Sequence, residues 1–239
     1  MFLTGYVVLV VAAGGAALLG FGAPDPTLGA LSLLFWLLAN LLGEVLWLPA
    51  PKSRGYLSMA NAANFATLIL LPIQPAMMIT AAATLMADFL FRRRKWYQGL
   101  FNCGACVVTV GAASLVFQRT GGSSTNIDAL LSPLNAVPLL AAAATYFLIN
   151  TWLVAGVVAI ETGRRPLEVW KTSFAFRYEI AGAVCLKLLG YLFAILFLTW
   201  GYMSAFLAVI ATYFIRDAYI RYVTAVDSQP SEPRQDRAA

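Results

Sequence analysis

The sequence predicts an all-α protein, a polytopic bundle of transmembrane helices, and two observations carry that prediction. The first is composition: 61% of the 239 residues are hydrophobic and only 11% are charged, whereas a soluble domain carries about 25% charged residues. The second is that the charges gather between apolar runs, most of them near the length of about 20 residues that crosses a bilayer core. Too few charges remain to cover a globular surface, so most of the surface must face lipid.

About eight apolar runs form a transmembrane helical domain over residues 1–226, with six to eight spans, and the polar residues 227–239 are expected to be a disordered cytoplasmic tail. The runs occupy residues 2–21, 28–48, 56–71, 73–91, 98–117, 136–160, 178–199 and 203–215. The first run lacks a basic segment before it, so it is expected to stay as an anchor and not to leave as a signal peptide. Its small residues at 12–17 favour close helix packing, either inside the bundle or against another protein.

Polar residues inside the next three runs must face a partner, a cavity or the interface, because lipid does not solvate them. Asn40 and Glu44 share one helix face, being one turn apart. Asn61 and Asn64 are three apart and are expected to bond neighbouring helices or to contact a ligand. The runs at 56–71 and 73–91 are short and are separated by Pro72, so they form either two full spans or a hairpin that returns to the same side.

Residues 87–102, ADFLFRRRKWYQGLFN, have the order that a chain shows when it turns at a membrane surface. Four consecutive cations at 92–95 precede two aromatic residues, and Asp88 and Asn102 lie in the apolar runs on either side. The cations either anchor the turn or, with Asp88, hold a phosphate or lipid headgroup. The prediction is a surface turn with Asp88 and Asn102 aimed into the bundle.

The second half of the chain continues this alternation. Residues 118–133 are polar and rich in Gly and Ser, which predicts a solvent-exposed loop. The run at 136–160 carries Asn150, and the basic segment beginning at Pro166 predicts a short amphipathic helix in the interface. Lys187 lies well inside the run at 178–199, where an ammonium needs a partner or water. We expect an ion pair with Glu44 or Asp88, with a ligand or ion site and a Schiff base as the alternatives.

The cations predict the orientation, because nearly all of them fall in alternate loops. These cations are Lys52, Arg54, Arg92, Arg93, Arg94, Lys95, Arg164, Arg165, Lys171, Arg177, Arg216 and Arg221, against Arg119 alone in the loops of the other side. The positive-inside rule then places both termini in the cytoplasm. The net charge of +5 is explained by topology, so we expect no nucleic-acid partner.

The absence of histidine removes His-based acid–base chemistry, haem ligation through His and the common zinc sites. Three cysteines in apolar runs are expected to pack as small apolar residues, not to form disulfides or a metal site. No phosphate loop or nucleophile elbow is present. We therefore predict no catalytic residue, no metal and no cofactor.

Two groups of residues remain as candidates for function. Buried polar residues form the candidate ligand site: Asn40, Glu44, Asn61, Asn64, Asp88, Asn102, Asn150 and Lys187. Residues at the membrane surface form the candidate partner-facing set: Arg92, Arg93, Arg94, Lys95, Trp96, Arg164, Arg165 and Lys171.

Residues 87–102, the small-residue span that follows to Phe117, and residues 145–171 resemble the multi-span membrane sensor module that precedes HD-GYP phosphodiesterase or GGDEF cyclase domains in many bacterial signalling proteins. The resemblance covers about residues 28–226 and implies a sensor in a bacterial inner membrane. The bundle is also broadly similar to the substrate-binding S components of energy-coupling-factor transporters, whose small-residue first helix docks the transport module. The chain departs from the sensor family, because an HD motif needs histidine and the 13-residue tail is expected to hold no enzyme. A signal would therefore pass to a separate partner, or the protein would work alone as a binder or carrier.

Three functions follow as hypotheses. The first is a non-enzymatic module that binds a small or lipophilic ligand in the membrane and signals to a cytoplasmic enzyme. The second is a transporter or a substrate-binding transport subunit that works with a transport module. The third, a lipid-modifying enzyme, lacks a catalytic constellation. Membrane lipids are the remaining expected partners.

Overall fold

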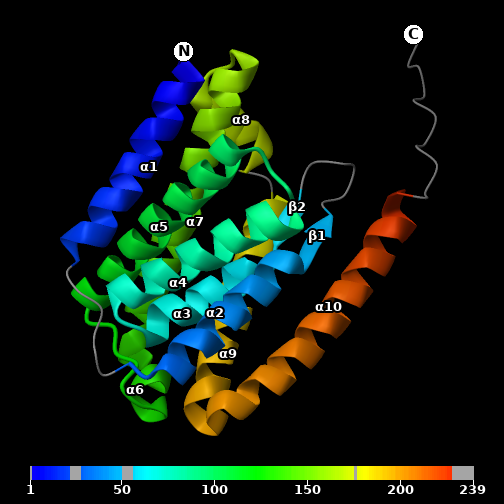
Figure 1. The fold of residues 1–239 in the computed structure, drawn as a ribbon. Coiled ribbons are helices and arrows are strands. Elements are labelled where there is room, and N and C mark those ends of the chain that lie inside the picture. Colours follow the sequence, from blue (N-terminus) through cyan, green and yellow to red (C-terminus); the bar gives the residue numbers. More distant parts are fainter. Residues whose placement is uncertain (1, 22–27, 50–55, 175–176, 228–239) are drawn as a thin grey trace.

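The computed structural model describes residues 2–21, 28–49, 56–174 and 177–227, which fold into a bundle of helices that run back and forth between two ends (Figure 1). The first half contains α1 (Phe2–Gly20), α2 (Ala30–Val45), α3 (Ala60–Leu70), α4 (Ile73–Met86), the π-helix η2 (Ala87–Phe91) and α5 (Trp96–Arg119). The second half contains α6 (Ile127–Leu131), η3 (Pro133–Asn135), α7 (Ala136–Thr162), α8 (Pro166–Ser173), α9 (Arg177–Trp200), η4 (Gly201–Met203) and α10 (Ser204–Asp227). The predicted all-α membrane bundle is confirmed.

One small element was not predicted. Strands β1 (Trp47–Pro49) and β2 (Tyr56–Ser58) pair antiparallel, with Trp47 opposite Ser58. They lie between α2 and α3, where the prediction had the ends of the apolar runs at 28–48 and 56–71 on either side of a basic loop. Lys52 and Arg54 of that loop, and the predicted tail after residue 227, lie outside the described residues.

Five helical segments of the described chain are long and apolar enough to cross a membrane. They are Phe2–Gly20, Ile73–Phe91, Trp96–Arg119, Pro133–Thr162 and Ile180–Leu207. Helix α3 has 11 residues, and a helix of that length rises only about 16 Å against a core of about 30 Å. Nine of those residues are buried, so α3 is an internal helix surrounded by other helices. The total number of spans remains a prediction.

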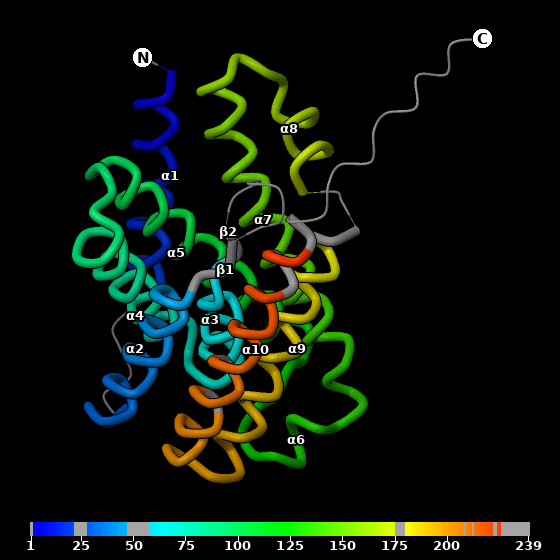
Figure 2. The backbone as a smooth tube through the Cα atoms, turned by 90° about the vertical axis from the view of Figure 1, so that its right-hand side faces the viewer, coloured from blue at the N-terminus to red at the C-terminus, as the bar shows by residue number. Residues whose placement is uncertain are grey.

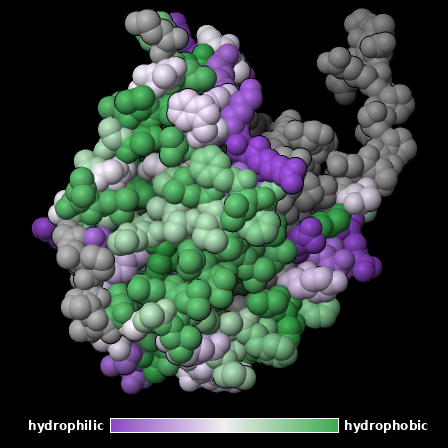
Figure 3. Space-filling model, in the orientation of Figure 1, coloured by the Kyte–Doolittle hydropathy of each residue, from purple (hydrophilic) through white to green (hydrophobic). Residues whose placement is uncertain are grey.

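The core is formed mainly by α3, α4 and α5, and an aromatic cluster joins α2 and α9 to it. Trp36 is fully buried, and its ring centroid lies 5.4 Å from that of Phe193 and 4.9 Å from that of Phe197. Outside this core, apolar side chains cover most of the face shown in Figure 3, and hydrophilic ones gather toward its edges. That is the surface expected of a bundle whose sides face lipid.

One glycine of the small-residue stretch of α1, Gly14, packs inside the bundle. A Cβ added at Gly14 would lie 3.1 Å from the Cα of Gly104, so the two glycines let α1 and α5 come into close contact. Tyr6 strengthens the same side of α1 by donating a hydrogen bond of 3.1 Å to the carbonyl of Leu153 in α7. Internal packing is thus the role seen for Gly14, whereas Ala12, Ala13, Gly15 and Ala16 are exposed, and docking of another protein remains a prediction.

The prediction of a solvent-exposed loop over residues 118–133 was wrong in part. The segment forms α6 and leads into η3, and Leu130 is fully buried. Ser124 Oγ donates to the carbonyl of Ile69 at 2.6 Å, and Tyr191 Oη donates to the carbonyl of Leu130 at 3.2 Å. The buried leucine and these two hydrogen bonds hold the segment against the bundle.

The two ends of the bundle differ in charge. Helix α8, the start of α1 and the last turns of α10 lie toward one end, and α6 lies at the other (Figures 1 and 2). We call the first the basic end, because it carries the turn at residues 92–95 and the segment from Arg164 to Lys171. Helix α8 confirms the predicted short helix at Pro166.

Candidate functional site

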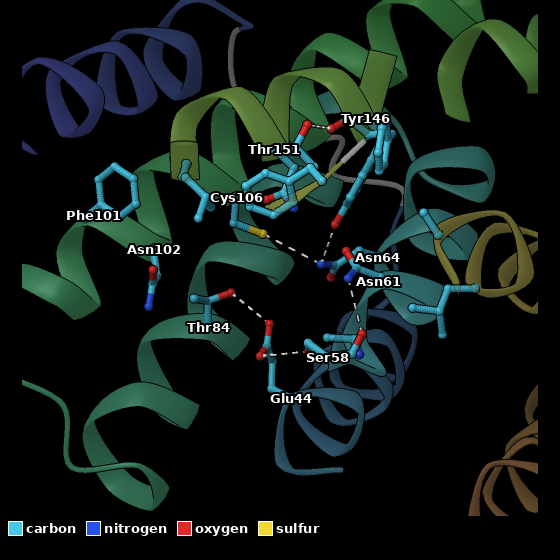
Figure 4. A pocket seen from close by; sticks show the side chains of 18 of the residues that line it. Glu44, Ser58, Asn61, Asn64, Thr84, Phe101, Asn102, Cys106, Tyr146 and Thr151 are labelled. Carbon is cyan, nitrogen blue, oxygen red and sulfur yellow. Dashed lines mark hydrogen bonds between the residues drawn. The ribbon is translucent and has the colours of Figure 1, made fainter. Parts of the chain in front are cut away.

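A cavity of about 380 Å³ lies toward the basic end, among α3, α5, α7 and α9 (Figure 4). Six of the eight polar residues predicted as a ligand site line it: Glu44, Asn61, Asn64, Asn102, Asn150 and Lys187. They come from five helices and are up to 143 positions apart in the chain (Glu44 to Lys187). A volume of this size is at the lower end of the range of about 300–1,000 Å³ for small-molecule sites.

Helix periodicity explains why each helix supplies several lining residues. Tyr146, Asn150 and Val154 recur every four residues on α7, and Asn102 and Cys106 do so on α5. Residues at that spacing lie on one face of a helix. Each helix therefore turns a mixed polar and aromatic stripe toward the cavity.

Asn64 ties three helices together at the cavity wall. Its Nδ2 donates to Tyr146 Oη of α7 at 3.1 Å and to Cys106 Sγ of α5 at 3.7 Å. Asn61 Nδ2 donates to the carbonyl of Ser58 at 3.2 Å. Asn64 thus has the interhelical role that was predicted as one alternative, while it also lines the cavity.

An ion-pair network closes the cavity on the side of the basic turn. Fully buried Asp88 accepts hydrogen bonds from Arg92 Nη1 at 2.9 Å and from Asn102 Nδ2 at 2.6 Å, and it forms an ion pair with Arg94 Nε at 3.3 Å. Glu44 accepts from Arg92 Nη2 at 2.7 Å. Asp88 is therefore adjacent to the cavity through Asn102, and one guanidinium joins the end of α2 to the end of α4.

The backbone at this turn is unusual. The π-helix η2 is held by a bond from the N–H of Arg92 to the carbonyl of Ala87, five residues back, and π-segments occur frequently at functional sites. Arg93 follows in the left-handed region with φ of 50°, which costs a non-glycine residue about 1–2 kcal/mol. Burial lowers the pKa of Arg92, but the charge of Glu44 and the hydrogen bonds to Asp88 and Glu44 outweigh it, so that the pKa is raised.

Arg92 differs from the other three cations of the turn, because its side chain pairs with two carboxylates of the bundle; the position of the four cations at the membrane surface remains a prediction. The side chain of Arg92 is only 17% exposed because two carboxylates in the bundle need a counter-charge. Arg94 pairs with Asp88 but stays 42% exposed. The other predicted surface residues are exposed: Arg93, Lys95, Trp96, Arg164, Arg165 and Lys171.

The expected ion pair of Lys187 with Glu44 or Asp88 was also wrong. Lys187 Nζ donates to the backbone carbonyl of Asn61 at 3.3 Å and lies 3.2 Å from the centroid of the Tyr146 ring. Both carboxylates are bound to arginine instead, and a planar guanidinium can bridge two carboxylates where an ammonium is a point charge. No salt bridge of the described residues includes Lys187.

Asn40 lies away from the cavity. Its Nδ2 donates to the carbonyl of Trp36 at 2.7 Å and to Thr67 Oγ1 at 2.8 Å. It therefore fastens α2 to α3 in the core.

Several lining residues were not among the predicted site residues, including Tyr146, Thr84, Cys106, Thr151 and Phe174. Their types are common in apolar helices, so only their position on the same face as a polar residue, as Tyr146 with Asn150, could have marked them. Trp170 of α8 donates to Thr151 Oγ1 at 2.9 Å and stacks on Trp152, which fixes α8 beside the cavity. Among the described residues no group of His, Cys, Asp or Glu could hold a metal.

Comparison with known families gives one match. The family model MASE9 matches residues 57–223, from β2 through most of α10. The matched region contains every lining residue of the cavity except Glu44. No curated protein and no solved structure matches the chain.

Proposed function

Because the chain belongs to the MASE9 family of membrane-associated sensor domains, we propose that it is a non-enzymatic sensor whose cavity binds a small molecule and whose basic end passes that state to a cytoplasmic partner. The observation that carries the proposal is the convergence of six polar residues from five helices on one cavity. Polar groups inside a membrane bundle are costly, and a ligand site is one of the few reasons to gather them.

The route of coupling is short. Arg92 and Arg94 line the cavity and also belong to the basic turn. A ligand that contacts either guanidinium changes the interactions that hold Asp88 and Glu44, and with them the π-helix and the left-handed Arg93. In this proposal the turn has two conformations, which differ in how these ion pairs are arranged, and the ligand favours one of them.

The partner surface in this proposal is the basic end. Arg93, Lys95, Arg165 and Lys171 are exposed there. The positive-inside rule supports a cytoplasmic location for this end in a bacterial inner membrane, where a signalling enzyme would meet it.

The proposal is tested by mass spectrometry of small molecules that copurify with the gently extracted protein. We compare wild type with Ala183→Phe, which fills the cavity, and with Ala181→Phe, which adds the same ring at an exposed position of the same helix. The expected result is a compound bound to wild type and Ala181→Phe and missing from Ala183→Phe. A compound retained equally by all three proteins, or by none, would contradict ligand binding in this cavity.

Transport is the second candidate, and the buried helix α3 favours it. A short internal helix beside a polar cavity resembles the interrupted helices that form substrate sites in transporters. Uptake of the copurified compound into proteoliposomes would separate the two functions: uptake that is lost in Ala183→Phe indicates transport, and binding without uptake indicates sensing.

A further inference from the structure

Lys187 is the one cation of the cavity wall that has no carboxylate partner among the described residues. Its side chain projects from α9, and the residue is only 7% exposed. An ammonium has three donors. One donates to the carbonyl of Asn61 and one side faces the Tyr146 ring, so donor capacity remains on the side of the cavity.

The other charges at the cavity compensate one another. Glu44 and Asp88 carry two negative charges, and Arg92 and Arg94 carry two positive charges within 2.7–3.3 Å of them. The ammonium of Lys187 therefore leaves a single excess positive charge at the cavity wall, on a residue that is only 7% exposed. Burying a charge without a counter-ion is costly, and a bound anion removes that cost.

A second donor lines the same cavity. Asn150 is one helical turn along α7 from Tyr146, and both residues line the cavity. The ammonium of Lys187 lies against the ring of Tyr146. Asn150 makes no side-chain hydrogen bond within the described part of the chain. Its amide is thus available for the second oxygen of an oxyanion, in contrast to the amide of Asn64, which donates to Tyr146.

The rest of the wall is largely aromatic and aliphatic. Phe101, Phe147 and Phe174 line the cavity together with Val154 and Leu186. Such a wall accommodates the apolar body of a ligand, while a cation would be repelled by the uncompensated charge of Lys187.

We infer that the cavity binds a small amphipathic molecule with one anionic oxygen group, a carboxylate or a phosphodiester, which contacts Lys187 and Asn150 while the apolar part lies along the aromatic side chains. This inference rests on the proposed sensor function and adds the chemical class of its ligand. The phosphodiester would come from a membrane lipid, and the carboxylate from a soluble or lipid-derived acid.

The test is thermal melting of the full chain in phosphatidylcholine nanodiscs. Soluble probes are butyrate, hexanoate and benzoate, each with its neutral amide, and a separate sample replaces part of the lipid by anionic phosphatidylglycerol. The variants are Lys187→Met, Lys187→Arg and, as a matched control, Lys171→Met, which removes an exposed lysine of α8.

We expect at least one anion to raise the melting temperature saturably, with no effect of its neutral counterpart. A higher melting temperature with a soluble carboxylate indicates an acid as the ligand, and a higher melting temperature with phosphatidylglycerol indicates a membrane lipid. Lys187→Met should weaken the apparent affinity on the order of 30-fold, since removing one partner of a buried charge pair has effects of that size. Lys187→Arg should retain part of the affinity, and Lys171→Met all of it.

Three results would overturn the inference: equal effects of acids and amides, full anion binding by Lys187→Met, or no effect of any anion. Failure of the ligand class is distinguishable from failure of the sensor function. A neutral compound that copurifies with wild type and is lost in Ala183→Phe refutes the anion and leaves the sensor function standing. If nothing copurifies and no probe acts, both are refuted.

Discussion

Replacing Arg92 by Met tests the ion-pair network directly. The substitution keeps an unbranched side chain but removes the charge that lies 2.7 Å from Glu44 and 2.9 Å from Asp88. Glu44 then has no cation partner among the described residues, while fully buried Asp88 keeps Arg94 at 3.3 Å and Asn102 at 2.6 Å.

Stranding a buried carboxylate costs about 3–5 kcal/mol. The side chain of Glu44 is 10% exposed and that of Arg92 17%, and Asp88 retains other donors, so we expect the lower end, about 3 kcal/mol. The free energy of unfolding is measured by titration of the purified protein from mild detergent into sodium dodecyl sulfate.

Arg93→Met is the matched control, since Arg93 is exposed and belongs to the same turn without a salt bridge to the described residues. It should change the unfolding free energy by no more than about 0.5 kcal/mol. Adding Glu44→Gln to Arg92→Met should restore part of the loss, because it removes the stranded charge. A loss with Arg92→Met no larger than that with Arg93→Met would refute the reasoning.

Two further predictions concern packing and orientation. Gly14→Leu should cost about 1–3 kcal/mol of unfolding free energy in the same titration, because a side chain at this position meets Gly104. Gly15→Leu should be near neutral, since nothing lies within 4 Å of its Cβ position. Equal losses in the two variants would contradict the α1–α5 contact. In a cysteine-free background in bacterial cells, a membrane-impermeant maleimide should label Thr125→Cys in intact cells and Lys95→Cys only after permeabilisation. The reverse pattern would contradict the assigned orientation.

Much of the site could be predicted from the sequence, because polar side chains in apolar runs are not solvated by lipid and therefore face the interior of the bundle. Asn61, Asn64, Asn150 and Lys187 are conspicuous for that reason alone, and the structure brings them to one cavity. Asn102 was likewise expected to face inward, because it lies in an apolar run next to the basic turn.

The partners of these residues could not be predicted, since they depend on contacts between distant helices. Asn64 meets Tyr146, 82 positions away, and Arg92 reaches Glu44 across 48 positions. The sequence also contains no sign of the π-helix that turns Asp88 toward Arg92 and Asn102. As a result, the carboxylates of Glu44 and Asp88 pair with Arg92 and not, as had been expected, with Lys187.

Hydrogen exchange of the basic turn tests most directly whether the cavity and the basic end are coupled. Amide exchange over residues 92–97 is compared by mass spectrometry among wild type, Ala183→Phe and Ala181→Phe in identical nanodiscs. Filling the cavity in Ala183→Phe should change the exchange rate of these amides several-fold, because Arg92 and Arg94 line the same cavity, while Ala181→Phe should match wild type. Identical exchange over residues 92–97 in all three proteins, with Ala183→Phe folded, would contradict the coupling on which the sensor function depends.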